Sequence, residues 1–82
     1  YLTSDQLAAA RRLNKVLREI ARGSMGVEEG SARLLRAGFD AVDYVALRDA
    51  ETLDMPDEGR PRRILAVARL GSLRLLDNMA VD

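Results

Sequence analysis

The clearest structural signal in the chain is the segment Arg69-Leu70-Gly71-Ser72-Leu73-Arg74-Leu75-Leu76-Asp77-Asn78. Two segments rich in apolar residues flank the pair Gly71-Ser72. Glycine tolerates the positive φ that the primed turn of a two-residue β-hairpin requires. The stretch therefore predicts a tight hairpin, with one strand over residues 64–70 and the next over residues 73–79.

A further strand is predicted upstream, over residues 41–48, where the side chains are β-branched, aromatic or small. Its residues alternate, with Val42, Tyr44 and Ala46 in one set and Asp43, Val45 and Leu47 in the other. Between this strand and the hairpin, residues 49–62 contain both prolines of the chain, a glycine and several acids. That composition predicts an exposed connection with at most one short helical turn.

The strongest predicted helix covers residues 3–22. Thr3 and Gln6 fit a capping box, and Leu2 and Leu7 are spaced as a hydrophobic staple around it. The helix ends at a glycine, Gly23, which can supply the left-handed stop. Apolar residues recur at helical spacing along one side, which we expect to lie across a core. These residues are Ala9, Leu13, Val16, Leu17 and Ile20.

A second, weaker helix is predicted over residues 24–37. It is weaker because two internal glycines, Gly26 and Gly30, each cost about 1 kcal/mol relative to alanine. Its end is better defined, since Gly38 fits the position after the C-cap and Phe39 can then pack back on a helix residue, Leu34, in a Schellman ending.

Together these elements predict an α+β fold, with two N-terminal helices packed on one face of a small three-stranded antiparallel sheet. We expect a single domain over residues 1–82, with its helical part at about 3–38 and its sheet part at about 41–80. A chain of this size buries roughly 60% of the surface of its unfolded state, so a complete multi-step active site is not expected within it.

Thirteen basic and thirteen acidic residues leave no net charge, so no overall field attracts nucleic acid or an anionic membrane. Cysteine and histidine are absent, which excludes disulfides and the ligands and nucleophilic centres that depend on thiolate or imidazole. No apolar run approaches the roughly 18 residues of a membrane span, and no signal peptide is recognisable, so we expect a cytoplasmic protein. Because the chain begins with Tyr1 rather than methionine, we also expect a fragment of a longer protein.

A basic ridge is predicted on the first helix, opposite its apolar side. It consists of Arg11, Lys15, Arg18 and Arg22, at spacings of four, three and four. Such a ridge can meet the phosphates of ATP across a domain cleft, or those of an RNA backbone. We favour a solvated face that keeps a small domain in solution, because Glu19 and the neutral total charge count against an anion site.

The hairpin carries a second group of candidate residues. Arg69 and Arg74 lie near the two ends of the predicted turn, where their guanidinium groups can reach an anion or a partner domain. Asp77 and Asn78 close the same motif. The four side chains can instead pair across the strands, which is worth about 0.2 to 1 kcal/mol for each pair. Both interpretations stay open at this point.

Catalytic patterns are not recognisable. The acidic residues Asp54, Asp57 and Glu58 lack the spacing and the closing bidentate glutamate of a calcium loop, and a proline interrupts them, which favours a solvated linker. Nothing places two carboxylates in one apolar pocket for acid–base catalysis, and Gly71-Ser72 is a hairpin turn rather than a phosphate-binding loop.

Three segments, in this order along the chain, resemble signature segments of the pantothenate synthetases, the ATP-dependent pantoate-β-alanine ligases. They are Tyr1-Leu2-Thr3, then Val42-Asp43-Tyr44-Val45 continuing through Arg48-Asp49-Ala50-Glu51-Thr52-Leu53, and the hairpin stretch of residues 69–78. The three matches span nearly the whole chain. Residues 23–30 depart from the family pattern, in which a more alanine-rich helix is expected.

The resemblance implies a parent enzyme that adenylates pantoate with Mg-ATP, releases pyrophosphate, and lets the amine of β-alanine attack the pantoyl-adenylate, within pantothenate and coenzyme A biosynthesis. It implies an N-terminal Rossmann-like nucleotide-binding domain as partner, carrying a His-Xaa-Gly-His signature and a Ser-Arg-Asn segment just before Tyr1. It also implies a cytoplasmic homodimer in which this chain is the C-terminal lid, closing over the cleft to keep water from the intermediate.

On this resemblance the chain carries no catalytic, cofactor-binding or metal-binding residue, and the chain alone is expected to be inactive. Its matching positions are Tyr1, Asp43, Tyr44, Arg48, Asp49, Arg69, Gly71, Arg74, Asp77 and Asn78, for which folding and docking are the implied roles. The alternative is a free-standing module that binds RNA or a protein. Against RNA stand the neutral charge and Tyr44 as the only aromatic residue of the predicted sheet.

Overall fold

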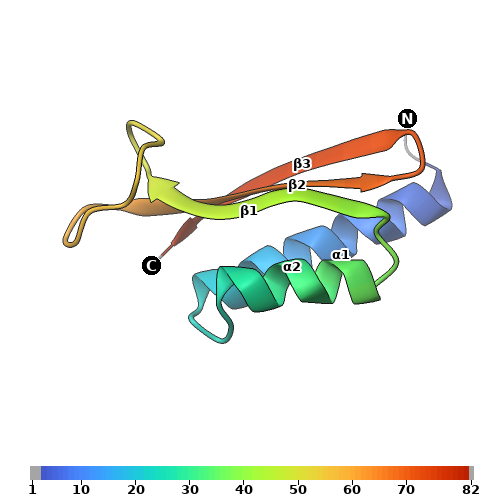
Figure 1. Cartoon of the computed structure of the whole chain (residues 1–82), viewed down its shortest axis with the longest axis horizontal. Coiled ribbons are helices and arrows are strands. Elements are labelled where there is room, and N and C mark those ends of the chain that lie inside the picture. Colours follow the sequence, from blue (N-terminus) through green and yellow to red (C-terminus); the bar gives the residue numbers. More distant parts are fainter. Residues whose placement is uncertain (1–2, 82) are drawn as a thin grey trace.

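The computed structural model describes residues 3–81 and confirms the predicted α+β architecture. Figure 1 shows two layers, with both helices on one side of an antiparallel three-stranded sheet. The elements are α1 (Ser4–Ala21), α2 (Val27–Arg36), β1 (Ala41–Asp49), β2 (Arg62–Leu70) and β3 (Leu73–Val81). Tyr1 and Leu2, which include one half of the predicted staple, lie outside the described residues.

The capping residues predicted for α1 are confirmed at both ends. The hydroxyl of Thr3 accepts a hydrogen bond from the Gln6 backbone N–H at 3.2 Å, and the Gln6 side chain accepts one from the Thr3 N–H at 2.9 Å. At the other end Gly23 has φ +82°, and the N–H of Ser24 donates to the carbonyl of Glu19 at 2.9 Å. This backbone arrangement is a Schellman motif, which stops the helix where a left-handed residue is required.

The start predicted for α2 is wrong by three residues, because the helix begins at Val27 rather than at Ser24. Ser24 is engaged in closing α1, and Gly26 is extended at φ −85° and ψ 173°, with no side chain to cap the new helix. Between them, Met25 is buried in the core cluster. The end of the helix is as predicted: Gly38 has φ +111°, and the N–H of Phe39 donates to the carbonyl of Leu34 at 3.2 Å.

Gly30 has a role that its low helix propensity does not predict. It is buried at the contact between the two helices, where a Cβ atom would lie 2.5 Å from Cδ1 of Ile20 and 3.3 Å from Cγ1 of Val16. The missing side chain therefore lets α2 approach α1 closely. The cost of glycine to the isolated helix is offset by this packing.

The sheet has the strand order β1-β2-β3, and its hairpin is the one that the sequence predicts. Leu70 pairs with Leu73 around Gly71-Ser72, and Gly71 has φ +59°. A glycine with positive φ at the first central position is typical of a type II′ turn. The strands extend beyond the predicted bounds, to Asp49 in β1, from Arg62 in β2 and to Val81 in β3.

The alternation predicted for β1 is wrong at its first residue, because the register shifts between Val42 and Tyr44. In such a β-bulge one residue, here Asp43, has no partner on the neighbouring strand. The extra residue reverses the alternation, so that the side chains after it point to faces opposite to those that the alternation before it predicts. As a result Val42 packs against the core together with Val45 and Leu47, rather than sharing a face with Tyr44.

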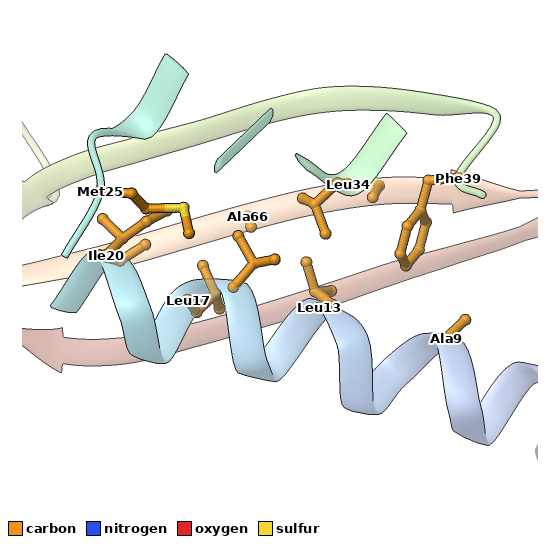
Figure 2. Packing of buried hydrophobic residues seen from close by; sticks show 11 residues of the cluster. Ala9, Leu13, Leu17, Ile20, Met25, Leu34, Phe39 and Ala66 are labelled. Carbon is orange, nitrogen blue, oxygen red and sulfur yellow. The ribbon is translucent and has the colours of Figure 1, made fainter. Parts of the chain in front are cut away.

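The core lies between the helices and the sheet. Figure 2 shows α1 side chains, including Leu13 and Leu17, pointing from the helix toward the strands, with Leu34 entering from α2 and Ala66 on β2 behind them. These side chains are fully or almost fully buried, which confirms the predicted apolar side of the first helix. The small side chains of Ala66 and Ala68 on β2 leave room for the large side chains of α1.

Candidate functional site

The candidate site is the face of the sheet that the helices leave uncovered, which we name the open face. Among residues 3–81 both helices lie on the other side (Figure 1). The side chains of Ile64, Ala66 and Ala68 belong to the core, so alternate residues of each strand point away from it. The open face comprises Tyr44, Ala46 and Arg48 from β1, Arg63, Leu65, Val67 and Arg69 from β2, and Arg74, Leu76, Asn78 and Ala80 from β3.

An apolar row crosses the middle of the open face. Val67 pairs with Tyr44 on one side and with Leu76 on the other. Val67 is only 1% exposed, whereas Tyr44 is 43% and Leu76 68% exposed. Beside this row Leu53 and Leu65 help to line a pocket of about 230 Å³. Two accessible apolar side chains, Tyr44 and Leu76, therefore flank a buried one on this face.

An ion-pair cluster adjoins this row near the hairpin turn. Arg69 and Arg74 pair across β2 and β3, and both contact the carboxylate of Asp43. The distances are 3.0 Å from Arg69 Nη2 to Asp43 Oδ1 and 3.2 Å from Arg74 Nε to Asp43 Oδ2. The bulge in β1 places this acid on the open face. Since one carboxylate meets two guanidinium groups that are each more than half exposed, donors remain available to an anion.

The structure places Asp77 on the opposite face of the sheet from these two arginines, and Asn78 on the same face as them. Asp77 lies on the helix side of the sheet and accepts a hydrogen bond from Asn14 Nδ2 at 3.2 Å. Asn78 lies on the open face and accepts one from Arg63 Nε at 2.7 Å. The four hairpin residues that the sequence groups together thus serve two different surfaces.

The basic ridge lies on α1, in the other layer of the molecule. Arg11, Lys15, Arg18 and Arg22 line a pocket of about 470 Å³ that also includes Asn14 and Glu19. Arg18 donates to Asn14 Oδ1 at 2.5 Å, and Glu19 pairs with Arg33 of α2 at 3.2 Å. Part of the ridge is therefore engaged in contacts within the helical layer, and the sheet does not bring it together with Arg69 and Arg74.

The connection between β1 and β2 is mostly exposed, as predicted, but residues 50–61 contain turns and no helix, so the short helical turn was wrong. Asp49, only 4% exposed, accepts hydrogen bonds from the backbone N–H groups of Glu51 and Thr52 at 2.9 and 3.0 Å and from Arg60 Nε at 2.7 Å. The hydrogen bond from Arg60, followed by those from the backbone, lowers the pKa of Asp49 to about 2. An aspartate at a strand end followed by a loop is the available sequence signal.

Asp40 is a second polar anchor that sequence reasoning misses. Its carboxylate accepts a hydrogen bond from the Gly71 N–H at 2.6 Å, and its own N–H donates to the carbonyl of Arg69 at 2.9 Å. The residue just before β1 thereby fixes the turn of the hairpin. The contact joins positions far apart in the sequence, so no local pattern indicates it.

Asp54, Asp57 and Glu58 lie in the exposed connection, and no three acidic side chains within residues 3–81 are grouped so as to hold a metal ion. The same range contains no helix that combines the length and the apolar character needed to cross a membrane.

Comparison of the whole sequence with known proteins identifies the family of this chain. Residues 1–80 match the family described as Pantoate-beta-alanine ligase. The chain belongs to this family. It is 42% identical to the pantothenate synthetase of Bradyrhizobium sp., 43% identical to that of Rhizorhabdus wittichii and 45% identical to that of Maricaulis maris.

These alignments cover 99 to 100% of the chain but only 31 to 32% of each relative. The chain thus spans about a third of the length of the pantothenate synthetases that it matches. Family membership is shown over the whole chain, while two thirds of each relative has no counterpart in it.

Proposed function

We propose that the chain is the C-terminal lid domain of a pantothenate synthetase. In this proposal the full-length ligase condenses pantoate and β-alanine with ATP to form pantothenate, AMP and pyrophosphate. The observation that carries the proposal is the family match over residues 1–80, in a chain that covers a third of its named relatives. The catalytic groups are assigned to the rest of the polypeptide.

The proposed reaction has two steps. The carboxylate of pantoate attacks the α-phosphorus of ATP and expels pyrophosphate, which leaves a pantoyl-adenylate. The amine of β-alanine then attacks the acyl carbon, loses a proton, and expels AMP as the amide forms. Water competes with the amine for the acyl carbon, so a cover that excludes water increases the yield of amide for each ATP consumed.

No residue of this chain is assigned to either chemical step. Mg²⁺ accompanies ATP in the proposed reaction, but no cluster of three acidic side chains within residues 3–81 fits a metal ion. In this proposal Mg-ATP binds to the N-terminal nucleotide-binding domain. The proposed role of the chain is to exclude water, through a stable domain that moves as one piece.

Several contacts support such a role for the hairpin. The type II′ turn at Gly71 and its hydrogen bond to Asp40 hold the turn against the start of β1. Arg69 and Arg74 stand beside it, paired with Asp43. Asp40 thus holds the turn, and Asp43 joins the two guanidinium groups beside it.

An RNA-binding module is the less favoured alternative. Arginines on the open face favour it, but recognition of single-stranded RNA uses several aromatic side chains on which bases stack. Tyr44 is the aromatic residue of the open face, and Phe39 is buried in the core. The family match provides no support for RNA binding.

The first experiment measures pyrophosphate release with pantoate, β-alanine and Mg-ATP. We expect turnover by the full-length ligase and none by the purified 82-residue chain, because the nucleotide-binding part is absent from it. Turnover by the chain, prepared free of host enzyme, would overturn the assignment of catalysis to the remaining polypeptide. A full-length protein that releases no pyrophosphate and forms no pantothenate would overturn the proposed activity.

The second experiment tests the lid role with Gly71→Val in the full-length ligase. Valine tolerates the φ of +59° badly, so the substitution should strain the turn and displace both arginines. We expect more AMP for each pantothenate formed, with most of the ATP affinity retained. Gly26→Val is the matched control, because Gly26 has an extended backbone and no neighbouring atom within 4 Å of an added Cβ. An unchanged ratio in a folded Gly71→Val enzyme with normal turnover would remove the lid role of the hairpin.

A further inference from the structure

We propose that the basic ridge of α1 binds the phosphate backbone of a single-stranded nucleic acid, through charge and without reading the bases. This property goes beyond the proposed function and does not rest on it. It also differs from the RNA-binding module considered above, because it uses the helical layer rather than the open face. Three features of the ridge support it: its linear form, its unpaired charge, and the residue types that line it.

The ridge is a line of cations on the side of α1 opposite its buried side chains. With about 3.6 residues in each turn and a rise of about 1.5 Å per residue, its four positions lie within about 60° of the helix circumference and extend over about 16 Å. All four side chains are exposed, and they line a hollow of about 470 Å³. A linear array of cations matches a linear polyanion, whereas a single small anion needs cations that converge on one point.

The charge of the ridge is not neutralised by the neighbouring acids. Glu19 counts against an anion site in the sequence, but the structure pairs its carboxylate with Arg33 of α2 at 3.2 Å. The carboxylate of Asp77 is held by Asn14. Within residues 3–81 no residue of the ridge forms an ion pair. Because like charges three or four residues apart destabilise a helix, the ridge is a cost to α1 that a bound polyanion relieves.

The residue types along the ridge select the kind of polyanion. Its hollow is lined by charged and polar side chains, with Ala10 as the apolar residue. A docked protein usually adds an apolar centre to its interface, and recognition of bases adds aromatic side chains for stacking. The phosphates of a single strand need neither, because arginine and lysine bind them through charge and hydrogen bonds. The ridge therefore fits a phosphate backbone better than an acidic protein segment.

The experiment measures the fluorescence anisotropy of a labelled oligouridylate of about twelve nucleotides, titrated with the full-length protein that contains this chain. Four phosphate contacts predict a slope of about 3 for log Kd against log salt concentration. Arg11→Gln combined with Lys15→Gln should lower this slope by about 1.4 and weaken binding about tenfold or more in about 50 mM salt. Lys15→Gln alone should lower the slope by about 0.7.

The matched control is Arg36→Gln combined with Arg62→Gln. It removes the same charge from exposed positions outside the ridge and should leave the slope unchanged. Unfolding midpoints confirm that both double variants are folded. Equal losses of binding in the two double variants, or wild-type binding by Arg11→Gln combined with Lys15→Gln, would place the oligonucleotide elsewhere and overturn the proposal.

Two further outcomes concern the ligand itself. Absence of binding by the wild-type protein at about 100 µM, in about 50 mM salt, overturns the proposal and leaves the ridge as a solvated face. An oligoglutamate and an inorganic polyphosphate of similar charge are titrated in the same way. Tighter binding of either one to the ridge than of the oligouridylate identifies an acidic protein segment or polyphosphate as the occupant, and also overturns the proposal.

Discussion

The two faces of the sheet are built from the same three strands and have opposite surroundings. On the helix side, Ile64, Ala66 and Ala68 are completely buried beneath α1 and α2. On the open face the central strand also contributes a buried residue, Val67, but its neighbours Tyr44 and Leu76 are exposed. The helix side is thus a completed core, while the open face presents apolar area that a longer polypeptide can cover.

The same substitution should therefore have different effects on the two faces. A leucine on the helix side contributes to the stability of the domain itself, because its removal leaves a cavity. A leucine on the open face contributes little until a partner covers it. The comparison can therefore be tested by identical substitutions on the two faces.

The largest expected effect comes from Leu17→Ala compared with Leu76→Ala in the 82-residue chain. Leu17 is fully buried between α1 and the sheet, so its truncation should lower the free energy of unfolding by about 2 to 5 kcal/mol. Leu76→Ala should change it by about 0.5 kcal/mol or less. Denaturant unfolding measures both values. Equal losses for the two variants would contradict the assignment of the faces.

A smaller effect is expected where the helices meet, at Gly30. Alanine should add about 1 kcal/mol of helix propensity, but its Cβ would collide with Cδ1 of Ile20. Ile20→Val removes that atom. We expect Gly30→Ala to be more favourable in the Ile20→Val background by about 0.5 kcal/mol or more, measured in a double-mutant cycle. Additive effects would show that the helices do not pack through this contact.

The smallest effect concerns Asp49, whose contribution to stability depends on pH. The folded pKa of Asp49 is about 2, below its ordinary value of 3.8, so its contribution to stability is complete above about pH 4 and is lost as the pH falls toward 2. Asp49→Asn should reduce stability at pH 7 and reduce the further loss between about pH 4 and 2. Urea midpoints across this range measure both, with Asp54→Asn in the same exposed connection as the control. Parallel acid losses in wild type and Asp49→Asn would contradict the role of this carboxylate.

Much of the fold could be predicted because its decisive signals are local. The capping box at Thr3, the glycine stop at Gly23 and the hairpin turn at Gly71 each depend on a few neighbouring residues, and all three are confirmed. The late start of α2 was missed because Ser24 closes the preceding helix, which propensity alone does not reveal.

The candidate site was harder to predict because it depends on contacts between distant residues. Arg69 and Arg74 could be singled out from the hairpin, but their shared partner Asp43 depends on a bulge that breaks the alternation of β1. Likewise, the sequence indicates one helix-covered face without showing which strand residues remain on the other. The structure supplies that assignment through the strand register.

The most direct test of the account compares Leu76→Asp with Leu35→Asp in the full-length ligase. The measured quantity is the ratio of AMP to pantothenate formed from pantoate, β-alanine and Mg-ATP, after unfolding midpoints confirm that both variants are folded. If the proposed lid closes through the open face, closure would bury the carboxylate of Leu76→Asp without a partner, so this variant is expected to raise the ratio while Leu35→Asp leaves it at the wild-type value. An unchanged ratio in Leu76→Asp would show that the proposed lid does not close through the open face.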